Sequence, residues 1–143
     1  DVSIKDWGIP LVSNPASLVR KPKQSRGRDR RLADAEALTL IDAAKNSRSF
    51  LLAPIITLAI ETAMRLGELL ALEWGNIDLK NQTALLPLTK NGEARTVPLT
   101  KQAVDALQSI PRQLNNPRVF WTWVRPDSFE NAWRRMLDQT GGF

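Results

Sequence analysis

The chain has 143 residues, which is enough for one domain with a substantial hydrophobic core. The sequence has no cysteine and no histidine, which excludes disulfides, thiolate metal sites and any chemistry that needs an imidazole. The net charge is +5, and no apolar stretch approaches the roughly 20 residues of a membrane span. We therefore expect a soluble, cytoplasmic protein without a metal or another cofactor.

In chain order, residues 1–31 come first, and prolines interrupt every long helix there. Pro10, Pro15 and Pro22 each remove a helical hydrogen bond. We interpret this stretch as an extended linker and expect folded structure to begin at Leu32.

The positive charge is concentrated at the end of this linker. Seven basic residues and one acidic residue lie between positions 20 and 31. The basic residues are Arg20, Lys21, Lys23, Arg26, Arg28, Arg30 and Arg31. Such a run favours a polyanionic partner, above all double-stranded DNA, because each phosphate contact releases condensed counterions. The alternative is a solvated segment whose charge only maintains solubility.

Three helices are expected next. Apolar residues at helical spacing predict one from about 32 to 46 and a second, apolar on nearly every side, from about 49 to 64. A shorter helix, 66–73, follows almost without a break. In this interpretation Ala63 lies inside the second helix and Arg65 closes it.

After residue 74 the period changes to that of strands. We expect short strands at 77–79, 83–88 and 95–99, with a hairpin turn at Asn91-Gly92, where both residues accept a positive φ. This is a small three-stranded antiparallel sheet, and with the helices around it the fold class is α+β, mostly helical.

The last third of the chain is expected to be helical again. Thr100 should cap a helix that reaches residue 110, and an extended segment is expected at 118–123. A final amphipathic helix runs from about 127 to a glycine pair at 141–142.

Two basic side chains are candidates for chemistry. Arg65 lies between Glu61 and Glu68, so it either makes ion pairs on a helix surface or is a guanidinium fork, fixed by Glu68, that binds a phosphate. Lys90 stands beside the hairpin turn opposite Glu93. It either forms an exposed cross-strand pair or is an ammonium group that reaches a minor groove or an active site.

Three segments of this chain resemble tyrosine recombinases in order and spacing. They are 61–72, 74–78 and the hairpin segment 89–99, and the basic lead-in is similar to that family's interdomain linker. The resemblance implies a basic linker at 1–31 and part of a recombinase catalytic domain at 32–143.

The resemblance also implies roles for single residues. Arg65 matches the first catalytic arginine and Lys90 the catalytic lysine, while Glu68 supports the site. Arg95 joins the seven basic residues of the run 20–31 as a DNA-binding residue. In the implied mechanism a tyrosine attacks a DNA phosphodiester and forms a 3′-phosphotyrosine, arginines stabilise the charge, and a lysine protonates the leaving 5′-oxygen.

The chain departs from the family pattern at two points. Ala63 stands where the family usually has glycine, a change that we interpret as mild because alanine suits a helix. More seriously, the sequence has neither histidine nor tyrosine and stops about where the family's His-x-x-Arg motif would begin. We therefore expect a fragment that does not cleave DNA.

Two other functions stay open: a non-catalytic DNA-binding module and, less favoured, a protein-interaction domain. A downstream His-x-x-Arg motif and tyrosine would decide for the recombinase. Full-length recombinases of this type assemble as tetramers on DNA, whereas we expect the fragment to be monomeric.

Overall fold

The computed structural model describes residues 5, 7, 8, 19, 20, 30–87 and 93–140. The chain divides into two units, Asp1–Arg31 and Leu32–Phe143. Most of the expected linker, the expected turn at 91–92 and the glycine pair at 141–142 lie outside the described residues.

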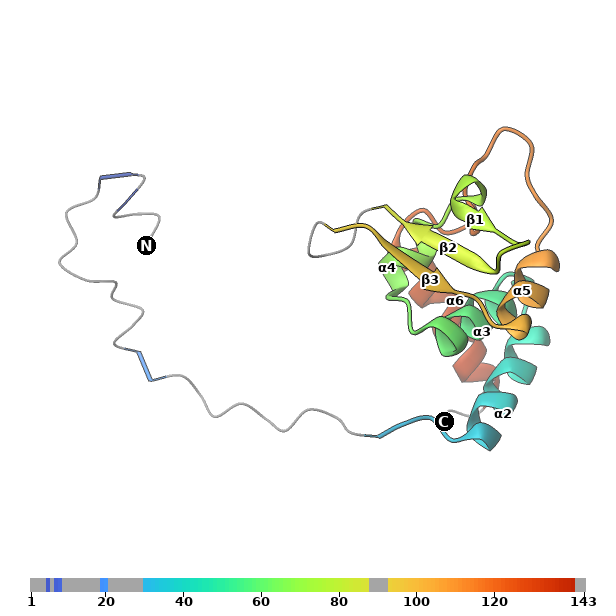
Figure 1. Cartoon of the computed structure of the whole chain (residues 1–143). Coiled ribbons are helices and arrows are strands. Elements are labelled where there is room, and N and C mark those ends of the chain that lie inside the picture. The colour runs from blue at the N-terminus through green and yellow to red at the C-terminus, as the bar shows by residue number, and fades with distance from the viewer. Residues whose placement is uncertain (1–4, 6, 9–18, 21–29, 88–92, 141–143) are drawn as a thin grey trace. The chain divides into compact units, whose positions relative to one another are not determined.

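The second unit combines helices with one small sheet (Figure 1). Its elements are α2 (Asp34–Lys45), α3 (Leu52–Thr62), α4 (Leu66–Leu70), the 3₁₀ helix η2 (Trp74–Asn76), β1 (Ile77–Asp78), β2 (Thr83–Leu86), β3 (Arg95–Pro98), α5 (Lys101–Gln108) and α6 (Pro126–Thr140). The predicted α+β class and the three-stranded antiparallel sheet, in the order β1-β2-β3, are confirmed.

Helix α3 is the central helix of this unit. It packs against both α2 and α5, and its apolar side chains are buried on several sides. The fully or nearly fully buried ones are Leu52, Ile55, Ile56 and Leu58. A helix without a wide polar face is stable only inside a domain, which explains why α3 occupies this place.

The end of α3 corrects one prediction from sequence. The helix stops at Thr62, and Ala63 takes the left-handed conformation with φ 51° and ψ 26°. Its N–H still donates to the carbonyl of Ala59 at 3.1 Å. The interpretation of Ala63 as an ordinary helical alanine was wrong, because this residue is a helix cap of the kind that favours glycine. Arg65 therefore does not close α3.

The sheet directs alternate side chains to two faces. Ala84 pairs with Val97, and both are buried against the helices. Leu86 pairs with Arg95 on the same face, at the end of β2. Because side chains alternate along a strand, Arg95 extends from the core-facing side of β3. The strands are one or two residues shorter than predicted, and after β1 the Asp78 carboxylate accepts bonds from Asn81 and starts a turn.

Thr100 caps α5 as predicted. Its hydroxyl oxygen accepts a bond from the N–H of Ala103 at 3.2 Å and donates to the Glu61 carboxylate at 2.6 Å. One hydroxyl thus satisfies a free N–H of α5 and ties that helix to the end of α3.

Replacing this hydroxyl tests both bonds. We expect Thr100→Ala to lower the free energy of unfolding by about 1 kcal/mol, the usual loss for a capping side chain, whereas Thr100→Ser should stay close to wild type. Chemical denaturation of the three proteins measures this. Equal losses in the alanine and serine variants would show that the methyl group matters and the hydroxyl does not.

Residues 118–123 do not form the extended segment that was predicted. Arg118 makes one isolated antiparallel bridge with Glu73, and the chain then turns. Two backbone bonds of 2.9 Å flank the bridge, from Trp74 N–H to the carbonyl of Pro117 and from Val119 N–H to the carbonyl of Leu72. The bridge thereby fixes the end of the α4 region to a distant loop.

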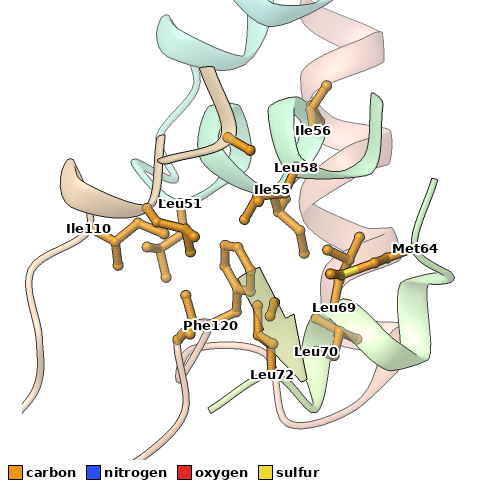
Figure 2. Close-up of a cluster of buried hydrophobic side chains, with 14 of the residues drawn as sticks. Leu51, Ile55, Ile56, Leu58, Met64, Leu69, Leu70, Leu72, Ile110 and Phe120 are labelled. Atoms are coloured by element: carbon orange, nitrogen blue, oxygen red, sulfur yellow. The ribbon is translucent and has the colours of Figure 1, made fainter. Parts of the chain in front are cut away.

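Phe120 follows this bridge and lies in the middle of the core (Figure 2). It is fully buried, and its ring stacks on Trp123 with centroids 6.4 Å apart. Trp123 is itself buried. In the part of the chain that the structure describes, no helix has the length and apolarity needed to cross a membrane.

Candidate active site and nucleic-acid interface

Arg65 occupies the first position before α4. Its backbone is extended, with φ −69° and ψ 150°, so the residue is the N-cap of that helix. The left-handed turn at Ala63 and the extended residue at 65 together separate α3 from α4. The Arg65 side chain is 61% exposed, which leaves its guanidinium accessible to a ligand.

Glu68 holds Arg65 in two ways. One carboxylate oxygen, Oε2, accepts the Arg65 backbone N–H at 2.9 Å, which satisfies a free donor at the start of α4. The other, Oε1, accepts Nη1 of the Arg65 guanidinium at 3.2 Å. The Glu68 side chain is only 8% exposed, so its position is determined by the fold.

A second arginine binds the same carboxylate. Nη2 of Arg95, at the start of β3, donates to Glu68 Oε2 at 2.9 Å. Figure 1 shows the beginning of β3 beside α4, in agreement with this ion pair. Arg95 remains 45% exposed. The three side chains form a cluster with one net positive charge, and both guanidinium groups reach solvent.

The pKa of the Glu68 carboxyl is lowered from its ordinary value. The backbone N–H bond from Arg65 is the largest cause, and the charges of Arg95 and Arg65 add to it, while partial desolvation opposes them. The carboxylate is therefore ionised at neutral pH and remains a fixed acceptor for both arginines.

The lowered pKa makes stability depend on pH in a defined direction. Since the folded-state value lies below the unfolded one, the stabilisation by Glu68 is complete above the ordinary glutamate pKa of about 4.3 and is lost as pH falls through the lower folded value. We expect Glu68→Gln to flatten the decrease in stability below about pH 4.5. Denaturation curves between neutral and acidic pH measure this, and an unchanged acid slope would contradict it.

Glu61 does not bind Arg65, the partner that its sequence position suggested. Its carboxylate accepts the Thr100 hydroxyl, so Glu61 contributes to the contact between α3 and α5. Of the two carboxylates that flank Arg65 in sequence, Glu68 is the one that binds its guanidinium. Arg65 thus combines an ion pair on its own helix with an exposed guanidinium, and the two interpretations offered for it are compatible.

The structure brings together three of the predicted site residues, namely Arg65, Glu68 and Arg95. Lys90 lies outside the described residues. In the basic run, Arg20, Arg30 and Arg31 are described and exposed. The other four, Lys21, Lys23, Arg26 and Arg28, lie outside the described residues. Among the side chains that are described, no three acidic ones gather as a metal site would require.

The link between Glu68 and Arg95 was not anticipated from sequence. The two residues are 27 positions apart, and nothing in either local pattern pairs them. One signal was available, since alternation along β3 places Arg95 on the same face as the buried Val97. An arginine that extends from the core-facing side of a strand can meet an acidic partner there, and Glu68 is that partner.

Residues 30–119, which include this cluster, match the phage integrase family. The chain belongs to that family. It is 46% identical over 129 residues to a shufflon-specific DNA recombinase of Escherichia coli, an alignment that covers 90% of this chain and 32% of the relative. The integrase-family chain thus spans about a third of that protein's length.

Solved structures agree with this family. The XerA recombinase is 26% identical with a TM-score of 0.61, and the match covers 83% of this chain and 44% of that one. A transposon integrase solved in complex with transposon right end DNA gives a TM-score of 0.66, with coverage of 83% and 47%. Its identity is 14%, so that likeness concerns the fold alone.

Proposed function

We propose that this chain is part of the DNA strand-transfer domain of a site-specific recombinase. The observation that carries the proposal is the Arg65 guanidinium, which Glu68 fixes from two directions while it stays 61% exposed. A planar guanidinium held in this way can bind two phosphate oxygens with defined geometry. Membership of the phage integrase family supports the assignment.

The proposed chemistry is phosphodiester exchange through a 3′-phosphotyrosine. A tyrosine oxygen forms a bond to phosphorus, the bond from phosphorus to the 5′-oxygen breaks, and that oxygen receives a proton. Arg65 would stabilise the negative charge on the non-bridging oxygens, and Lys90 would donate the proton. A later attack by a 5′-hydroxyl reverses these changes, so no nucleotide cofactor takes part.

The chain by itself is proposed not to cleave DNA. Its sequence contains no tyrosine, so a phosphotyrosine cannot form on it. What it supplies is phosphate binding by Arg65 and Arg95, proton donation by Lys90, and contacts from the basic run at 20–31. We propose that the isolated chain is monomeric, which sedimentation can test, and that a longer protein containing it assembles on DNA.

The proposed partner is double-stranded DNA. The dense positive charge of the run 20–31 supports it, because each phosphate neutralised releases counterions. The transposon integrase that shares this fold was solved with DNA, which agrees with the same partner. Most of the binding energy should come from the run, and a smaller part from the arginine cluster.

Binding of the chain to a short duplex at about 50 and 200 mM salt tests the proposal. We expect weak binding that falls steeply with salt. Changing the seven basic residues of the run to glutamine should reduce affinity at low salt by about tenfold or more, and Arg65→Ala by a few-fold.

Arg134 provides a matched control for the loss of one charge. It is an exposed arginine on α6, so Arg134→Ala removes the same charge at another place on the same unit. Affinity should then change less than in Arg65→Ala. Absence of binding by the wild-type chain at low salt would refute the proposal, and equal effects of the two substitutions would remove Arg65 from it.

A further inference from the structure

We propose that Arg95 is a positioning residue, which fixes the Arg65 guanidinium through their shared carboxylate, Glu68. The assignment rests on the proposed function, since it concerns the orientation of Arg65 toward a DNA phosphate. It also gives Arg95 a role beyond that of a simple phosphate contact.

The distances favour positioning. Glu68 Oε2 accepts two bonds of 2.9 Å, one from the Arg65 backbone N–H and one from Arg95 Nη2. Oε1 is then directed to the Arg65 guanidinium at 3.2 Å. If the bond from Arg95 is removed, Oε2 keeps one of these two partners, and the carboxylate can rotate away from the Arg65 side chain.

Burial and connectivity support the same conclusion. Glu68 is the buried member of the cluster, and both arginines reach it from more exposed positions. Glu68 also borders a cavity of about 100 Å³, lined by residues of the α4 region and the end of β2. Arg95 is the first residue of β3, so its ion pair with Glu68 also joins this strand to the start of α4.

Two assignments for Arg95 therefore differ in what they predict. An arginine that only contacts phosphate adds affinity independently of Arg65. A positioning arginine contributes mainly through Arg65, so its removal also removes most of what Arg65 provides. The changes in binding free energy that two substitutions cause add up when the two groups act separately, and they do not add up when the groups are coupled.

The first measurement needs no DNA. In wild type, Arg95→Gln and Arg134→Gln, NMR follows hydrogen exchange of the Arg65 amide and titration of the Glu68 carboxyl. We expect Arg95→Gln to speed exchange of that amide about two- to fivefold, the range for one partly exposed ion pair, and to raise the pKa of Glu68 toward the ordinary value. Arg134→Gln should change neither. Unchanged exchange and titration in Arg95→Gln would overturn the proposal.

The second measurement is a double-variant comparison of duplex binding at low salt. Arg65→Ala and Arg95→Gln are measured alone and together. Positioning predicts that the double variant binds within about twofold of Arg95→Gln alone, because Arg65 is already displaced. If the fold-change in affinity of the double variant equals the product of the two single fold-changes, the two arginines contact phosphate independently, and the proposal is overturned.

Glu68→Gln distinguishes the two assignments by the direction in which the affinity for DNA changes. Removing a negative charge close to DNA strengthens binding if both arginines act independently. If Glu68 and Arg95 position Arg65, the same substitution weakens binding by a few-fold instead. Should the wild-type chain bind no DNA, the proposed function fails, while amide exchange and titration still decide whether Arg95 holds Glu68 and, through it, Arg65.

Discussion

Phe120→Ala is expected to lower the free energy of unfolding by about 3–5 kcal/mol, the largest effect of any single change proposed for this protein. Phe120 is fully buried, and Figure 2 shows it in the middle of a core cluster whose members come from both halves of the chain. Truncation to alanine removes that apolar surface and leaves a cavity that a helical core closes only in part.

Two further variants make this measurement decisive if Phe120→Ala does not fold. Phe120→Leu retains most of the volume, so we expect a loss of about 1–2 kcal/mol in urea denaturation. Phe50→Ala is the matched control. Phe50 is 57% exposed with its ring 6.0 Å from Trp121, and we expect a loss below about 1.5 kcal/mol, the upper range for an aromatic pair. Similar losses at positions 50 and 120 would contradict the central place of Phe120.

Ala63→Gly is expected to raise the free energy of unfolding by about 1 kcal/mol. Ala63 has φ 51°, and an L-residue with a Cβ loses about 1–2 kcal/mol in the left-handed region, where glycine is free of the penalty. Glycine also makes the unfolded chain more flexible, which offsets about 0.4–1 kcal/mol of that gain. Thermal or urea denaturation measures the difference.

Ala59→Gly gives the opposite sign on the same helix. Ala59 lies inside α3 and accepts the N–H of Ala63, so glycine there should cost about 0.5–1 kcal/mol. The two substitutions make the same chemical change one helical turn apart. A loss of stability in Ala63→Gly would mean that the left-handed cap is not the conformation this residue adopts in solution.

Periodic patterns made most of the fold predictable. The apolar spacing indicated each of the long helices, and the alternation after residue 74 indicated the three strands, because these patterns reflect which side chains face the core. Thr100 was recognisable as a cap from its residue type and position. The spacing of Arg65 and Glu68 predicted an ion pair between them, which the structure contains, whereas their assignment to a site came from the family resemblance.

The predictions that failed concern residues whose local conformational preference is overridden by long-range packing. Alanine favours helix, yet the chain must leave α3 at Ala63 because α4 begins only three residues later, at Leu66, so Ala63 forms the cap despite its helix propensity. Residues 118–123 read as extended, but after Arg118 the chain turns to bury Phe120. The pairing of Glu68 with Arg95 joins residues too distant for any local pattern to connect.

The bridge between Glu73 and Arg118 has a consequence for the order in which this protein forms during synthesis. The backbone bonds beside it join Leu72 to Val119 and Trp74 to Pro117, across more than 40 residues. Ribosomes add about 5–20 residues per second, so the α4 region emerges several seconds before its partner loop. We expect nascent chains that stop before residue 117 to expose the apolar sides of α3 and α4, and to be bound by chaperones until the loop arrives.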